Sequence, residues 1–174
     1  MTARPSAIFS FALPKEFLEE TTITGPTSRH LQRDRTTIQK ASLAIGAVFL
    51  LVGVLGFIPG ITTNYGALQL AGHESKAMLL DVFQVSVLHN LVHLLYGVAG
   101  IVLAKTVSGA RTYLIVGGVI YLLLWLYGLL SSGSAANFVP LNGADNWLHL
   151  GLGLGMTALA LLLTTRTTRA DKAH

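Results

Sequence analysis

The chain contains no cysteine and few charged residues. Without cysteine it has no disulfide, no iron–sulfur cluster and no thiol chemistry. Charged residues make up 11% of the 174 residues, against roughly 25% in an average soluble domain. The chain also lacks a Gly-x-Ser-x-Gly elbow, a His-Glu-x-x-His helix and any pair of carboxylates within an apolar run. No catalytic signature is present, and we expect a protein that is not an enzyme.

Hydrophobic residues, which form 52% of the chain, are clustered in four runs. Each run approaches the roughly 20 apolar residues that a helix needs to cross about 30 Å of hydrocarbon. The sequence therefore predicts an all-α fold, a four-helix transmembrane bundle. We expect a cytoplasmic N-terminal arm over 1–40, a transmembrane domain over 41–165 and a basic tail over 166–174. The predicted spans lie near 41–63, 82–107, 112–132 and 146–165.

The basic residues predict the orientation of the chain in the membrane. Eleven of the twelve Lys and Arg residues fall on one side of the predicted spans, and only Lys76 falls on the other. By the positive-inside rule, both termini are expected in the cytoplasm. These basic residues flank apolar spans and are not interleaved with stacking aromatic residues, so we expect membrane lipids as partners and no nucleic acid.

The motif Asn-x-x-His-Leu-x-x-Gly occurs twice, beginning at Asn90 and at Asn146. The second copy follows the first by 56 residues, and this offset pairs the first predicted span with the third and the second with the fourth. The repeat predicts two tandem helical hairpins related by a pseudo-twofold axis along the membrane normal. It also predicts that His93 and His149 lie at the same depth.

Small and aromatic residues predict how the helices pack and where they meet the membrane surface. Gly151-x-x-x-Gly155 has the spacing that favours a close helix crossing. Four aromatic side chains near the predicted interfaces are expected to form a belt of anchors. They are Tyr113, Trp125, Tyr127 and Trp147.

Polar side chains follow one face of the second predicted span, and Asp81 and Gln84 lie on its other side. Strongly polar groups within a span normally face the bundle interior or a cavity, so this face is predicted to point inward. It comprises Ser86, His89, Asn90, His93, Tyr96, Gly97 and Gly100.

Three interpretations of the histidines remain open. Neutral imidazoles can form an interhelical polar network with Asn90, Asn146, Ser86 and Tyr96. Alternatively, His93 and His149, with His89 beside them, can bind a cofactor, either a haem between opposed imidazoles or the magnesium of a chlorophyll. The spacing His89-x-x-x-His93 also suits a metal or proton site, with His149 or Asp145 as a third ligand.

The N-terminal arm carries apolar and aromatic residues that precede a basic segment. Phe9, Phe11, Phe17 and Leu18 suggest docking to a partner protein. The basic residues that follow, closest to the first span, suit the anionic lipids of the cytoplasmic leaflet.

Three short motifs carry a family resemblance: Leu55-Gly-Phe-Ile-Pro-Gly60, His89-Asn-Leu-Val-His93 and Asn146-Trp-Leu-His149. In this order they resemble the bacterial four-helix membrane family known as domain-of-unknown-function family 4383. The resemblance spans about 41–165 and implies four spans in a bacterial inner membrane, with no established activity to transfer. The arm lies outside it.

We therefore expect a non-enzymatic, multi-pass accessory or structural subunit of a larger bacterial membrane complex. It would dock onto other membrane-protein subunits through its arm and its lipid-facing helices. The alternative is a haem- or chlorophyll-binding subunit that uses His93 and His149 for electron transfer or light harvesting.

Overall fold

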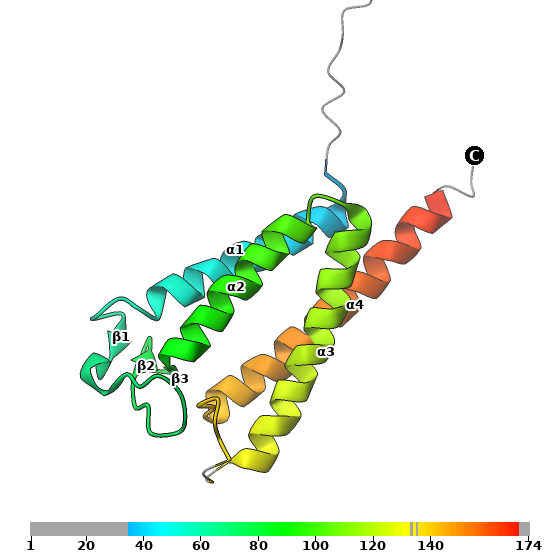
Figure 1. The fold of residues 1–174 in the computed structure, drawn as a ribbon. Helices are drawn as coiled ribbons and strands as arrows, with labels where there is room; N and C mark the ends of the chain where they lie inside the picture. The colour runs from blue at the N-terminus through cyan, green and yellow to red at the C-terminus, as the bar shows by residue number, and fades with distance from the viewer. Residues whose placement is uncertain (1–34, 133, 135, 171–174) are drawn as a thin grey trace, which may run out of the picture. The chain divides into compact units, whose positions relative to one another are not determined.

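The computed structural model describes residues 35–132, 134 and 136–170. Within these residues the chain forms four helices joined in an up-and-down order (Figure 1). The predicted all-α, four-helix fold is confirmed. The helices are α1 (Thr37–Leu55), α2 (Val87–Leu103), α3 (Val107–Ser131) and α4 (Gly143–Ala170).

The helices associate as two tandem hairpins, as predicted. The most extensive packing is between α1 and α2 and between α3 and α4. α1 ends, and α2 begins, at the same end of the bundle as a small sheet (Figure 1). We call this the sheet end; α3 ends and α4 begins there too. The opposite end holds Thr37, Leu103 and Val107.

Three of the helices are long and apolar enough to cross a membrane. These are α1, α3 and the part of α4 from Gly143 to Leu163. α2 has 17 residues, which at 1.5 Å per residue gives about 26 Å. The predicted span over 82–107 is wrong at both ends, because Ser86 caps α2 and Thr106 caps α3. The first predicted span is also too long, since α1 ends at Leu55 and a turn follows.

A three-stranded antiparallel sheet, which the sequence did not predict, occupies the α1–α2 connection. Its strands are β1 (Thr62–Thr63), β2 (Met78–Leu79) and β3 (Phe83–Gln84), in the order β1-β2-β3. Three residues connect β2 to β3, since Leu79 pairs with Phe83. Leu80 and Asp81 both have positive φ, 53° and 59°, as is typical of the central residues of a tight hairpin turn. Beneath the sheet, Ala77, Leu79 and Val85 are buried.

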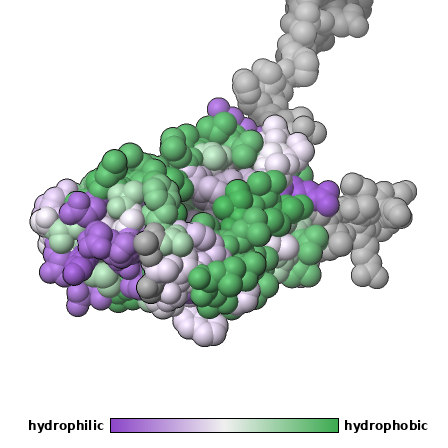
Figure 2. All heavy atoms as spheres, turned by 60° about the horizontal axis from the view of Figure 1, so that its bottom comes forward, coloured by the Kyte–Doolittle hydropathy of each residue, from purple (hydrophilic) through white to green (hydrophobic). Residues whose placement is uncertain are grey.

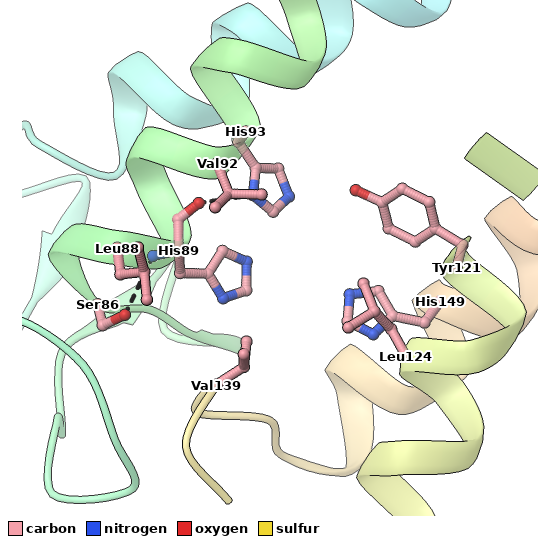
Figure 3. Close-up of a pocket in the computed structure, with 9 residues that line it drawn as sticks. All are labelled: Ser86, Leu88, His89, Val92, His93, Tyr121, Leu124, Val139 and His149. Carbon is pink, nitrogen blue, oxygen red and sulfur yellow. Dashed lines mark hydrogen bonds between the residues drawn. The ribbon is translucent and has the colours of Figure 1, made fainter. Parts of the chain in front are cut away.

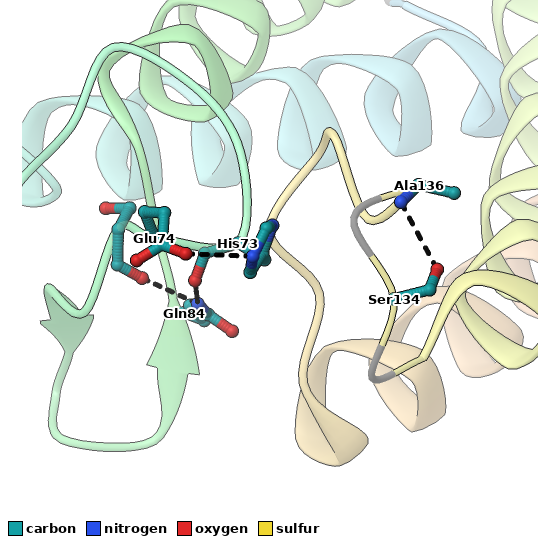
Figure 4. Close-up of polar contacts among 6 residues, drawn as sticks. His73, Glu74, Gln84, Ser134 and Ala136 are labelled. Carbon is teal, nitrogen blue, oxygen red and sulfur yellow. Dashed lines mark hydrogen bonds and ion pairs between the residues drawn. The ribbon is translucent and has the colours of Figure 1, made fainter.

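Polar contacts hold the loops of the sheet end together (Figure 4). His73 Nε2 lies 2.9 Å from Glu74 Oε1, and Gln84 Nε2 donates to the carbonyl oxygens of His73 and Ser75. Asp81 and Gln84 are therefore in a turn and a strand, and their predicted place on the second helix is wrong. Hydrophilic side chains gather around the sheet, whereas hydrophobic side chains cover the helices (Figure 2).

Glycines bring the helices of each hairpin into backbone contact. A Cβ atom added to Gly46 of α1 would lie 2.9 Å from the carbonyl oxygen of Gly97. A Cβ added to Gly118 of α3 would lie 2.9 Å from the carbonyl oxygen of Gly153. Close approach of this kind is typical of small residues at membrane helix interfaces. The two hairpins therefore repeat the same contact.

This repeat corrects the predicted register of the two halves. Gly97 corresponds to Gly153, an offset of 56 residues, but Gly46 corresponds to Gly118, an offset of 72. The predicted pairing of the first and third helices at an offset of 56 is therefore wrong. The 16 additional residues lie in the α1–α2 connection, which carries the sheet.

Two packing predictions are also corrected. A Cβ added to Gly151 or Gly155 would meet no atom within 4 Å, so the predicted close crossing at these residues does not occur within the described chain. Tyr113 was expected at a membrane interface, yet it is buried in the core of the bundle. Trp147, in contrast, is 74% exposed.

Candidate functional site

The first two histidines of the site stand one helical turn apart on α2. Ser86 precedes the helix in an extended conformation, and its hydroxyl accepts a hydrogen bond from the backbone N–H of His89 (3.1 Å). This cap starts the helix so that His89 and His93 share one face. Their rings are nearly parallel, with centroids 4.4 Å apart, and each residue is only 8% exposed.

A backbone hydrogen bond fixes the tautomer of His93. Its Nδ1 lies 2.9 Å from the carbonyl oxygen of His89. A carbonyl only accepts hydrogen bonds, so Nδ1 must carry the proton. In the neutral ring, Nε2 is then left as an acceptor or ligand atom.

The third histidine comes from α4 and completes a symmetric arrangement. The His149 ring meets the Tyr121 ring edge-on at 5.1 Å, while the Phe49 ring meets the His93 ring at 5.4 Å. Phe49 and Tyr121 stack on each other, with centroids also 5.4 Å apart. Each hairpin thus supplies one aromatic ring and one imidazole, and His93 and His149 occupy corresponding positions, as the repeated motif predicted.

His89, His93 and His149, which we call the histidine cluster, line one cavity (Figure 3). Its volume is about 100 Å³. Tyr121 points into it from α3, and the rest of the wall is mainly Leu88, Val92, Leu124 and Val139. At roughly 30 Å³ per molecule, the cavity holds about three waters. Pockets for organic ligands are typically about 300–1,000 Å³.

A second, smaller cavity lies on the sheet side of the same cluster. Its volume is about 90 Å³, and its wall includes the three histidines, Tyr121 and Asp145. The histidine cluster therefore separates two small cavities, and an acidic side chain joins it from α4.

Several polar atoms near the histidine cluster are buried without a partner. In the described part of the chain, His89 Nδ1 and His149 Nδ1 have no hydrogen bond, and the same holds for the hydroxyls of Tyr96 and Tyr113. An unsatisfied buried group costs about 1–3 kcal/mol, and the cost is greater where lipid replaces water. His89 and His149 line the cavity, so their unpartnered nitrogens favour small polar molecules such as water in it.

The asparagines that were predicted to form hydrogen bonds between helices instead pack against glycines. The Asn90 side chain lies against Gly56, and the Asn146 side chain lies against Gly128, so each amide packs within its own hairpin. Asn90 Nδ2 and Asn146 Oδ1 have no hydrogen-bond partner among the described residues. The predicted interhelical hydrogen bonds are not made by these atoms, and the Ser86 hydroxyl accepts from its own helix.

The carboxylate of Asp145 accepts hydrogen bonds from backbone N–H groups. Its Oδ2 accepts from the N–H of Gln84 (3.1 Å) and from the N–H of Asn142 (3.0 Å). It thereby ties the first turn of α4 to β3. Among the described residues, no group of three or more His, Asp or Glu side chains is placed to hold a metal ion.

Two residues of the site, Phe49 and Tyr121, were not predicted. The signal that identifies them is a second repeat, Gly46-Ala-Val-Phe-Leu-Leu51 and Gly118-Val-Ile-Tyr-Leu-Leu123. It has the offset of 72 that the helical packing shows. The proposed docking residues Phe9, Phe11, Phe17 and Leu18 lie outside the described residues.

Together, the apolar helices and the repeated hairpins define a four-helix membrane protein with a buried histidine cluster. The chain belongs to the family described as Domain of unknown function (DUF4383), which matches residues 39–162. No curated protein and no solved structure matches the chain.

Proposed function

We propose that this protein is a non-enzymatic accessory subunit of a larger assembly in a bacterial cytoplasmic membrane. It docks through its lipid-facing helices, with the N-terminal arm as a second contact. The observation that carries the proposal is the outward face of α4. This face is formed by Trp147, Gly151, Gly155, Ala158 and Leu162, all of them exposed.

The two glycines of this face contact no other helix among the residues that the structure describes. Glycines such as Gly46 and Gly118 contact a neighbouring backbone, but a Cβ on Gly151 or Gly155 would meet nothing within 4 Å. A glycine within a helix costs roughly 0.5–1 kcal/mol relative to alanine. In membranes, small residues four apart let a second helix approach closely. A helix of another subunit fits the shallow surface between Trp147 and Leu162.

Exposed apolar residues at the sheet end support a further contact, in addition to the α4 face and the N-terminal arm. Leu70, Leu80 and Phe138 lie in loops outside the helices and are 58–74% exposed. Large apolar side chains on a loop surface mark interaction sites when they gather beside polar ones. This end of the bundle therefore also suits a partner subunit.

A haem or chlorophyll site is the second candidate, and one observation favours it. His93 donates Nδ1–H to a carbonyl and leaves Nε2 free, which is the arrangement of many ligating histidines. The volume of the cavity that all three histidines line, about 100 Å³, opposes it, because pockets for organic ligands are typically about 300–1,000 Å³. A larger pocket of about 450 Å³ is lined by His93 but not by His149. The subunit role is therefore our first proposal.

The proposed docking face of α4 can be tested by replacing its glycines with larger side chains. We expect the wild-type protein, solubilised gently from its native membrane, to migrate in a complex larger than the detergent-bound monomer. The double variant G151L/G155L should migrate as the free monomer, because two leucines occupy the space that a partner helix needs. A47L is the matched control, since Ala47 is exposed on α1. A wild-type protein that migrates alone, or a complex that survives G151L/G155L, would contradict the proposal.

A further inference from the structure

Polar side chains continue from the histidine cluster toward the opposite end of the bundle. The Tyr121 ring, which contacts His149, lies 5.6 Å from the Tyr96 ring, and the Tyr96 ring lies 5.0 Å from the Tyr113 ring. We call the histidine cluster with these three tyrosines the polar column. All six residues belong to the interior of the bundle.

The polar column is extended at both of its ends. At the sheet end, Asp145 lines the smaller cavity together with the histidine cluster. At the other end, the Tyr113 hydroxyl lies beside Gly100, whose carbonyl oxygen accepts from the Ser42 hydroxyl (2.9 Å). From His89 to Gly100 the path follows eleven residues of α2, a rise of about 16 Å at 1.5 Å per residue.

Unpartnered atoms concentrate in the polar column. His89 Nδ1, His149 Nδ1 and the hydroxyls of Tyr96 and Tyr113 are all buried without a hydrogen bond in the described chain. The two cavities that the histidine cluster lines, of about 100 and 90 Å³, are large enough for a few waters, and polar atoms in such a cavity are normally hydrated. Tyr96 and Tyr113 line neither of these cavities.

We propose that the polar column is a path for protons. Five of its six groups can accept one proton and donate one: the imidazoles of His89 and His149 take a proton on one nitrogen and release one from the other, and a hydroxyl or a water does the same through its oxygen. His93, whose Nδ1–H donates to the carbonyl oxygen of His89, lies beside the path. A proton that enters at the sheet end is matched by one that leaves toward Ser42. No covalent bond other than O–H and N–H bonds changes. Chains of ionisable residues within membrane bundles carry protons in this way.

An apolar layer sets the rate of this transfer. Ile38 and Ala110 are buried in the same core cluster as Tyr113 and lie toward the opposite end. Water must cross this layer for a proton to leave, so we expect slow flux in the wild type. Replacement of Ile38 by serine adds a hydroxyl there and should raise the flux. This inference does not rest on the proposed subunit role.

Proton flux can be measured with the purified full-length chain in vesicles that contain a pH-sensitive dye. A potassium gradient with valinomycin supplies the driving force. We expect flux above that of empty vesicles, a loss toward the empty-vesicle level in Y96F and in H149Q, and an increase in I38S. Y65F and H73Q are matched controls, because Tyr65, in the short 3₁₀ helix Tyr65–Ala67, and His73, in a loop, are both exposed in the α1–α2 connection.

Folding of each variant is verified by circular dichroism and by a single elution peak. Y96F removes only a hydroxyl without a partner, so it should fold as the wild type does. Flux at the empty-vesicle level in both wild type and I38S would overturn the proposal. Flux that is unchanged in Y96F and H149Q would overturn it as well.

Discussion

In the hairpin of α1 and α2, the Ser86 hydroxyl accepts from the N–H three residues later, and Asn90 packs on Gly56. In the hairpin of α3 and α4, Asn142 Oδ1 accepts from the N–H of Asp145, and Asn146 packs on Gly128. The same helix cap and the same contact between an asparagine amide and a glycine therefore occur in both hairpins. We call these repeated backbone and packing contacts the frame of the bundle.

Inside that frame His93 and His149 correspond, but other polar groups are not repeated. At equivalent positions one hairpin has His89 and the other has Asp145, whose carboxylate accepts two backbone N–H groups. Likewise Tyr96 corresponds to Leu152, and Phe49 corresponds to Tyr121. The comparison indicates that packing constrains both halves alike, whereas the polar residues around the repeated histidines differ between them.

The largest effect is expected where the backbones of two helices touch. G46V and G118V each place a side chain against a carbonyl oxygen that lies 2.9 Å from the added Cβ. Overpacking of this kind costs about 1–3 kcal/mol or more. G118V should lower the free energy of unfolding at least as much as G46V, because its Cβ also meets the Thr157 hydroxyl. Unfolding in detergent, followed by circular dichroism, measures both losses. G155V is the control, because its Cβ would meet no described atom within 4 Å; a loss in G46V or G118V no larger than in G155V would contradict the close backbone contact.

A smaller effect should separate the two caps. S86A removes one hydrogen bond at a helix N-terminus, which costs about 1 kcal/mol. N142A removes the same bond and also the bond from Asn142 Nδ2 to the carbonyl oxygen of Val82 (2.8 Å). We expect N142A to lower the free energy of unfolding about twice as much as S86A, since each net bond contributes about 1 kcal/mol. Equal values would mean that the contact with Val82 adds nothing.

The smallest effect is expected at the most asymmetric position. Y96F deletes a hydroxyl without a partner and leaves an apolar side chain, as Leu152 is in the other hairpin. The free energy of unfolding should change by less than about 1 kcal/mol. The same unfolding measurement checks this. A larger loss would show that the hydroxyl has a strong hydrogen-bond partner in the folded protein.

The helices were predictable because long apolar runs leave few alternatives, and the repeated Asn-x-x-His motif predicted the hairpins. The sheet was not predictable from the sequence, since strands of two residues such as Thr62–Thr63 are too short to show an alternating pattern. A single offset of 56 also could not describe two halves in which the first helices correspond at an offset of 72 and the second helices at an offset of 56. Tyr113 was placed at an interface because its position near a helix end does not show which face it occupies.

The most direct test of the site is solid-state NMR of the protein in bilayers with ¹⁵N-labelled histidine. The resonances of the histidine cluster are assigned by comparison with H89Q, H93Q and H149Q. The structure predicts magnetisation transfer from water to the ring nitrogens of His89 and His149, and none from lipid acyl chains. Transfer from acyl protons without transfer from water would contradict a shared, hydrated cavity between the two hairpins.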